Sequence, residues 1–475
     1  MELSIIEASG EAWAEHTFGK AELGDKRRTH RLVKMAQQIA KKPAGNVTKV
    51  FSAPADREAA YRFVENTDVD PESILKGMRF AVVERCSNEP FVFLAIDGSS
   101  VTLADHFRKK DYGSIGPRKL GARGLKVMAA LAVSSEGAPI GLTSLHMWPR
   151  GKKNKVHRNK RALAEKETKF AADAAVVTAK AFDEKQPSCR VWFQLDREHD
   201  AEQLLEKYSS TKHLFTVRAK ANRRVKTENG KAQYVRDIIA QKKTHRGTFT
   251  LDIPAGHKRS ARTAMISVRA AKVTLLLRDQ RTERIREFET HAVYAFESSH
   301  LPDGEERIEW LLYTNHPIET DEDLALILFG YTQRWRVEDF FRAWKTTGCN
   351  VEETQLHSTH SVRIWAIMLA ATAARIERLK HLSRTQPSLP ASVEFTEFEL
   401  EALVMLKKVR KRKTEQIPEG VPTIEEAVRW IAELGGYTGK SSGGPPGSVT
   451  IRRGLEPLRI AAEVVKLMRS SEKKM

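Results

Sequence analysis

Short apolar runs separated by turn-forming residues predict a mixed α/β fold in the first half of the chain. Phe91 to Ile96 is an uninterrupted apolar run that ends at Asp97, and Arg190 to Leu195 is a second run that ends at Asp196. Runs of this length between turn residues are typical of buried strands. Further candidate strands are residues 126–133, 140–148 and 213–220, and candidate helices are residues 162–182 and 201–208.

The pattern differs on both sides of this region. Near the N-terminus, Leu32, Val33, Met35 and Ile39 share one helical face and Pro43 ends the segment, and residues 55–66 predict a second helix. Residues 221–316 have a pattern typical of an all-β region, with strand-like segments at 248–253, 263–268, 273–277, 289–296 and 308–313. Helical patterns return from residue 379 onward. We therefore expect helical ends around an α/β core that carries an all-β insertion.

A long amphipathic helix is predicted from Thr320 to Thr347. Thr320 and Asp323 resemble a capping box at its start, and Gly348 is a typical stop. At about 100° per residue, one face carries the large apolar side chains of Leu326, Phe329, Val337, Phe340 and Trp344. The opposite face carries a polar stripe, which consists of Tyr331, Arg334, Glu338, Arg342 and Lys345.

Two interpretations of this stripe are open. It is either a solvated face in which Glu338 pairs with Arg334 or Arg342, four residues away, or part of a catalytic site. The two aspartates that follow the predicted strands favour the second interpretation, because Asp97, Asp196 and Glu338 together offer three carboxylates. Two magnesium ions need such a set if they keep water and phosphate oxygens as their other ligands.

The net charge of the chain indicates which kind of partner the protein binds. The 475 residues include 80 Lys and Arg against 61 Asp and Glu, a formal net charge of +19 that favours a polyanion such as nucleic acid. Three widely spaced cysteines form no disulfide or zinc pattern, and the first residues lack a secretory signal. The apolar stretch 364–374 ends at Arg375 and is too short to cross a bilayer, so we expect a buried helix. The cytoplasm, with association to the nucleoid, is the expected location.

At this point the residues resemble a known family. Tyr331, Arg334, Glu338 and Lys345 have the spacing Tyr-x-x-Arg-x-x-x-Glu-x-x-x-x-x-x-Lys, which is the signature of Tn5-like members of the IS4 family of bacterial DDE transposases. The similarity extends over most of the chain, in matching order, and includes residues 21–29, 59–63, 196–198, 310–312 and 434–437.

The resemblance implies an RNase H-like catalytic core at residues 76–375 with the β insertion at about 221–316. It also implies a helical DNA-binding domain at 1–75 and a helical dimerisation domain at 376–475. The implied activity is cut-and-paste transposition: binding of the inverted ends, metal-dependent cleavage through a DNA hairpin, and joining of the 3′ ends to target DNA. The implied partners are double-stranded DNA and a second subunit, and no association with a membrane is implied.

Site residues also follow from the resemblance. Asp97, Asp196 and Glu338 would hold two Mg²⁺ ions, with Mn²⁺ as a substitute, and Tyr331, Arg334 and Lys345 would complete the catalytic set. The expected DNA contacts are Arg27, Arg28, Arg62, Arg218, Lys220, Trp310 and Arg342. Trp310 could instead be an ordinary core residue of a strand. Arg218 and Lys220 could instead be ordinary surface residues. Two alternative functions stay open as well: a metal-dependent nuclease that does not join DNA, and an inactive regulatory DNA-binding protein.

Overall fold

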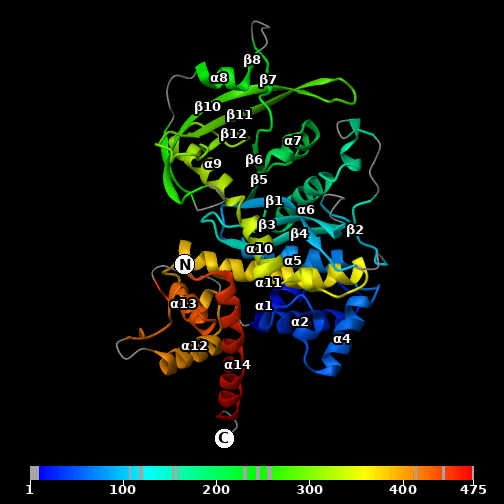
Figure 1. Cartoon of the computed structure of the whole chain (residues 1–475), viewed down its shortest axis with the longest axis vertical. Helices are drawn as coiled ribbons and strands as arrows, with labels where there is room; N and C mark the ends of the chain where they lie inside the picture. The colour runs from blue at the N-terminus through cyan, green and yellow to red at the C-terminus, as the bar shows by residue number, and fades with distance from the viewer. Residues whose placement is uncertain are drawn as a thin grey trace. The chain divides into compact units, whose positions relative to one another are not determined.

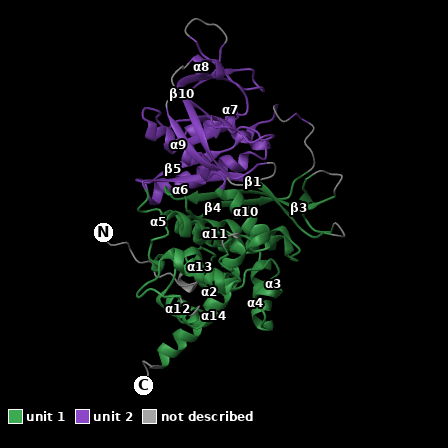
Figure 2. Cartoon of the chain, turned by 60° about the vertical axis from the view of Figure 1, so that its left-hand side comes forward, with its two compact units in different colours: residues 1–89, 98–151, 336–475 green, residues 90–97, 152–335 purple. Residues whose placement is uncertain are grey.

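The structure is a computed structural model of the chain, and it describes residues 10–105, 109–116, 121–151, 156–157, 160–227, 233–241, 247–253, 259–411, 415–440 and 444–472. The chain divides into two units (Figure 2). Unit 1 comprises residues 1–89, 98–151 and 336–475, and unit 2 comprises residues 90–97 and 152–335. Each unit is therefore assembled from segments that are far apart in the sequence.

The N-terminal part of unit 1 is helical (Figure 1). Its helices are α1 (Gly10–Phe18), α2 (Lys26–Lys41), α3 (Val47–Val50), α4 (Pro54–Glu65) and α5 (Pro71–Arg85). Asp25 begins α2 by accepting a hydrogen bond from the backbone N–H of Arg27, and Asp70 caps α5 in the same way. Helices α2 and α4 confirm the two predicted N-terminal helices, and the apolar face of α2 is buried as expected.

Unit 1 also contains three antiparallel strands, and two helices pack against one of them. Strand β3 (Arg123–Val133) pairs with β2 (Gly113–Ser114) and β4 (Pro139–Trp148), and it lies next to β1 (Phe91–Thr102) in the strand order. Helices α5 and α11 (Thr359–Thr385) pack against β4. The predicted buried helix at 364–374 is confirmed as the middle of α11, where all these residues are buried.

Further helices make up the C-terminal part of unit 1. They are α12 (Glu397–Arg410), α13 (Ile424–Leu434) and α14 (Ser448–Glu472). Capping boxes begin the first two: Thr396 exchanges hydrogen bonds with Glu399, and Thr423 with Glu426. The three helices share one apolar core with the end of α11.

Unit 2 is built around a mixed sheet. Its strands besides β1 are β5 (Arg190–Leu195), β6 (Leu214–Arg218), β7 (Arg224–Val225), β8 (Gln233–Tyr234), β9 (Thr248–Ile253), β10 (Arg262–Arg278), β11 (Ile285–Glu297) and β12 (Glu309–Thr314). The order is β1-β5-β6-β12-β11-β10-β7-β8, with β9 paired to β10. Strands β1, β5 and β6 are parallel, and the described pairings from β6 to β8 are antiparallel. The helices are α6 (Lys169–Lys185), α7 (Glu202–Ser209), α8 (Val235–Gln241) and α9 (Asp321–Gln333). This mixed sheet with flanking helices confirms the predicted α/β class.

Three strand predictions need correction. Strand β1 does not end at Asp97 but continues to Thr102. The segments predicted as strands at 263–268 and 273–277 form one strand, β10, because its pairing with β11 is unbroken from Ile266 to Arg278. The predicted all-β insertion also contains the short helix α8. In each case, pairing with a distant strand or packing in the tertiary structure outweighs the local pattern.

The predicted helix from Thr320 to Thr347 is interrupted. Its capping box and its stop at Gly348 are confirmed, but α9 ends at Gln333, and α10 (Arg336–Arg342) and a π-helical turn (Ala343–Thr347) follow. The backbone N–H groups of Arg334 and Trp335 bond to carbonyls three residues back, each at 3.2 Å, so the chain tightens there. The predicted single helical face therefore fails at its N-terminal end, where Phe329 is 39% exposed. Further along it holds, since Val337, Phe340 and Trp344 are buried.

Candidate active site

Asp97 and Asp196 lie on neighbouring parallel strands of unit 2. The register of β1 and β5 ends at the pair Ala95 and Gln194; Asp97 lies two residues beyond Ala95, and Asp196 two residues beyond Gln194. Continuing the register places the two aspartates side by side at the same edge of the sheet. Their side chains are 21% and 30% exposed, so both carboxylates are within reach of solvent.

Arg334 is paired with the first of these aspartates. Its Nη1 donates to Oδ2 of Asp97 at 3.1 Å, and its guanidinium lies over the ring of Trp335 at 5.1 Å. The Arg334 side chain is only 9% exposed. A guanidinium held this way is a charge-assisted donor with fixed direction, which suits it to bind a carboxylate on one side and a phosphate on the other.

Tyr331 lies in an aromatic and basic environment. Its ring meets that of Trp310 edge to face at 5.1 Å, and both residues are buried. Burial raises the pKa of the Tyr331 phenol, against the charges of Arg334 and Arg218, which lower it, and Arg218 also hydrogen-bonds to it. The phenol is therefore neutral at physiological pH and available as a hydrogen-bond donor.

Asp196 has a local structure of its own. It caps a short 3-10 helix (Arg197–His199) by accepting a hydrogen bond from the backbone N–H of Glu198 at 2.8 Å. The Nδ1 of His199 lies 3.6 Å from the same carboxylate, and the ring is buried. Burial lowers the pKa of His199, although Asp196 and Glu198 raise it. His199 is thus a neutral, buried neighbour of Asp196.

Gly330 brings helix α9 close to the strands that carry the aspartates. A Cβ atom at this position would lie 2.5 Å from Cε1 of Phe93 on β1 and 3.0 Å from Nε2 of Gln194 on β5. Real Cβ atoms do not approach neighbours at 2.5 Å, so only glycine allows this packing. The close approach positions the last turn of α9, which bears Tyr331, and Arg334, which follows directly after it. Sequence reasoning missed Gly330 because nothing in the local pattern indicates what the helix touches.

The remaining signature residues belong to unit 1. Glu338 is partly exposed on α10. Lys345, in the π-helical turn, donates from Nζ to Oγ of Ser99 at 3.1 Å, and Ser99 is two residues beyond Asp97 in β1. Arg342 is exposed and pairs with Asp339 at 3.3 Å.

Most of the other predicted DNA-binding residues have partners within the protein. Arg28 pairs with Asp68 at 2.6 Å, and Arg62 pairs with Glu58 one turn away at 2.5 Å. The Arg27 side chain bonds to Asp25 yet is 92% exposed. Lys220 is exposed, and its backbone N–H donates to Asp200. These residues present charge at the surface, and their roles in DNA binding stay predictions.

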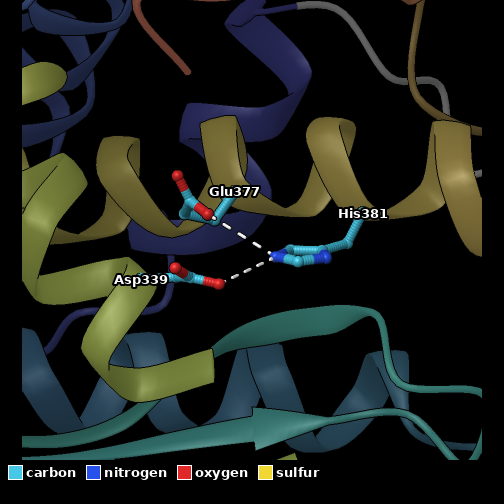
Figure 3. Close-up of side chains that lie close together, drawn as sticks. All are labelled: Asp339, Glu377 and His381. Atoms are coloured by element: carbon cyan, nitrogen blue, oxygen red, sulfur yellow. Dashed lines mark ion pairs between the residues drawn. The ribbon is translucent and has the colours of Figure 1, made fainter. Parts of the chain in front are cut away.

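A second group with acidic side chains lies in unit 1, between α10 and α11 (Figure 3). The Nε2 of His381 lies 3.5 Å from a carboxylate oxygen of Asp339 and 3.6 Å from one of Glu377. Lys380 donates to Glu377, and Arg342 and Arg336 pair with Asp339. Because these cations already compensate both carboxylates, we interpret the group as an ion-pair network that joins the two helices.

This network predicts an acid-dependent loss of stability. Burial alone would raise the pKa of Asp339, but the close contact with His381 and nearby positive charges lower it from 3.8 to about 2. The folded-state pKa lies below the unfolded value, so the stabilisation is present above about pH 4 and is lost as the pH falls toward 2. It amounts to about 2 kcal/mol. We expect the Tm difference between wild type and Asp339→Asn to narrow between about pH 4 and pH 2. A constant difference, as for an exposed control such as Asp173→Asn, would contradict this.

Three known protein families match successive parts of the chain. Residues 10–69 match the family described as transposase DNA-binding, residues 149–374 match the transposase DDE domain, and residues 371–474 match the transposase Tn5 dimerisation domain. With the mixed sheet, these matches define a DDE transposase, an RNase H-like, metal-dependent enzyme that cuts and joins DNA. The chain belongs to the Tn5-like group of the IS4 family of these transposases.

These matches confirm the predicted family, fold class and enzyme class. They also establish that the protein binds DNA, forms dimers and depends on divalent metal ions. None of the helices in the described ranges combines the length and the hydrophobicity that a membrane-spanning helix needs.

Proposed function

We propose that this enzyme performs cut-and-paste transposition. It binds the inverted ends of a transposon, cleaves them through a hairpin intermediate and joins the 3′ ends to target DNA. The observation that carries the proposal is the pair Asp97 and Asp196 on adjacent parallel strands, with Arg334 bound to Asp97. It is supported by DNA-binding, DDE and dimerisation regions in one chain. In this proposal the DNA-binding, catalytic and dimerisation domains comprise residues 1–75, 76–375 and 376–475.

Asp97, Asp196 and Glu338 are the proposed ligands of two Mg²⁺ ions, for which Mn²⁺ can substitute. The ligand atoms that these residues offer support this assignment. Both aspartates offer oxygen atoms, are partly solvent-exposed and lie at the same edge of the sheet. Magnesium prefers such oxygen ligands to histidine or cysteine. When bound, the ions would activate the attacking water or 3′-hydroxyl and stabilise the leaving oxygen.

Other residues of the signature act on the DNA strand itself. Arg334, held in place by Asp97, orients a phosphate next to the scissile bond. The neutral phenol of Tyr331 donates a hydrogen bond to the same strand, and Lys345, which contacts Ser99, supplies a second positive charge. Trp310, which packs on Tyr331, offers an aromatic face for a base that is extruded when the hairpin forms.

Binding of whole ends involves more of the surface. Arg27, Arg28 and Arg62 are the proposed contacts of the N-terminal helices with the end sequence. Arg218, Lys220 and Arg342 are the proposed contacts with backbone phosphates. Helix α14 leaves Ile460, Val464, Leu467 and Met468 exposed at helical spacing, which supports contact with a second subunit. Two subunits would then hold two ends in one synaptic complex.

The test is magnesium-dependent cleavage of a labelled duplex that carries the inverted repeat found beside the coding gene. We expect terminal hairpins, followed by products joined to a second duplex. Omission of Mg²⁺ should stop both steps, and addition of Mn²⁺ should restore them. Cleavage without joining would favour a nuclease. Tight binding without cleavage in either metal would favour a regulatory DNA-binding protein, and the carboxylate assignment would be wrong.

A further inference from the structure

A small cavity in unit 1 is lined by none of the candidate active-site residues. It is lined by residues of α1, α5, β4 and α11. Its free space is about 20 Å³, enough for one water molecule or one monatomic ion. Most of its wall is apolar, but Thr17, Arg85 and Arg375 also line it.

Arg375 is the unusual member of this wall. It is 5% exposed and lies in the middle of α11, with its guanidinium over the ring of Trp13 at 5.3 Å. Its Nη2 donates to the carbonyl of Glu394 at 3.2 Å. Its Nε and Nη1 are buried and have no hydrogen-bond partner among the described residues. Buried charges are normally paired, because leaving one uncompensated in the interior is costly.

The residues around Arg375 carry more positive charge than negative charge. Burial, together with the charges of Arg378 and Arg375 and against the pull of Glu394, lowers the pKa of Arg85 to about 10. The Glu394 carboxylate itself pairs with Arg378 at 2.6 Å. Arg459 is buried as well, and burial together with the charge of Arg375 lowers its pKa to about 9, although Glu399, 3.9 Å away, raises it. The region around the cavity therefore has an excess of positive charge.

We propose that this cavity binds a small monovalent anion such as chloride. A water molecule would satisfy hydrogen bonds but would leave the charge uncompensated, whereas a monatomic anion fits the small free space and compensates the charge. The anion would join α1, within the DNA-binding match, to Arg375, within the dimerisation match. Its occupancy would stabilise the attachment of the first helix to the scaffold. This role is independent of the transposition chemistry.

The first test is thermal unfolding of the full-length protein in chloride and in gluconate at equal ionic strength. Gluconate is too large to enter, so chloride should raise the Tm by about 2 °C, and bromide should act like chloride. Arg375→Met should abolish this anion-specific shift. Arg429→Met, which removes an exposed arginine on α13, should retain it. A shift that persists in Arg375→Met would overturn the proposal.

The second test does not depend on a variant that folds. Crystals of the wild-type protein grown in sodium bromide should show an anomalous peak among Trp13, Arg85 and Arg375. An empty site, or a water molecule without an anomalous signal, would mean that the ring of Trp13 alone compensates Arg375, and the anion site would be rejected.

Discussion

Replacement of Asp196 by asparagine is expected to lower the rate of magnesium-dependent end cleavage by about 10³-fold. Loss of one carboxylate removes several kcal/mol of transition-state stabilisation by metal, and about 4 kcal/mol corresponds to this factor. The local fold should survive, because the asparagine oxygen still accepts the hydrogen bond from the Glu198 backbone that Asp196 now accepts. Asp97→Asn and Glu338→Gln should have effects of the same size.

The measurement is single-turnover cleavage of a labelled end, together with a mobility-shift assay for binding of the same DNA. Binding should persist in all three variants. Asp173→Asn is the matched control, since it removes an exposed carboxylate on α6 that has no place in the proposed site. Cleavage near the wild-type rate in any of the three variants would remove that residue from the metal site.

Gly330→Ala is expected to impair cleavage more than it impairs folding. The new methyl group would lie 2.5 Å from the Phe93 ring. This ring is in contact with Phe91, Trp192 and Phe329 and has little room to move aside. Overpacking of this kind costs about 1–3 kcal/mol, and the better helix propensity of alanine offsets up to about 1 kcal/mol of it. Helix α9 would have to shift, and Tyr331 and Arg334 would shift with it.

Because a displacement of about 1 Å in a positioned group can cost up to 100-fold in rate, we expect cleavage to fall by about 10-fold or more. The Tm should fall by only a few degrees. Gly447→Ala is the control, since its added methyl group meets open space. If Gly330→Ala cleaves DNA at the rate of wild type, the close approach of α9 does not position the site.

Several features of this protein could be predicted from the sequence because they depend on neighbouring residues. The run from Arg190 to Leu195 forms β5 and ends before Asp196 as expected. Thr320 and Asp323 cap α9 as expected, since both partners lie within one helical turn. The signature residues Tyr331 and Glu338 identify the family without any knowledge of the fold. Such signals survive folding because the atoms that produce them are adjacent in the chain.

Other features depend on contacts between residues far apart in the chain, and only the tertiary structure decided them. Periodicity placed Arg334 on a polar face, yet it is buried against Asp97, 237 positions away in the sequence. The helix breaks after Gln333, Gly330 is required by the ring of Phe93, and Arg375 lines a cavity whose other walls come from distant elements. A residue's own neighbours determine its propensity and its hydrophobic face, but burial and ion pairing depend on what the fold brings alongside it. The sequence by itself therefore determined the family and the main elements, and the tertiary structure decided the partners of the side chains.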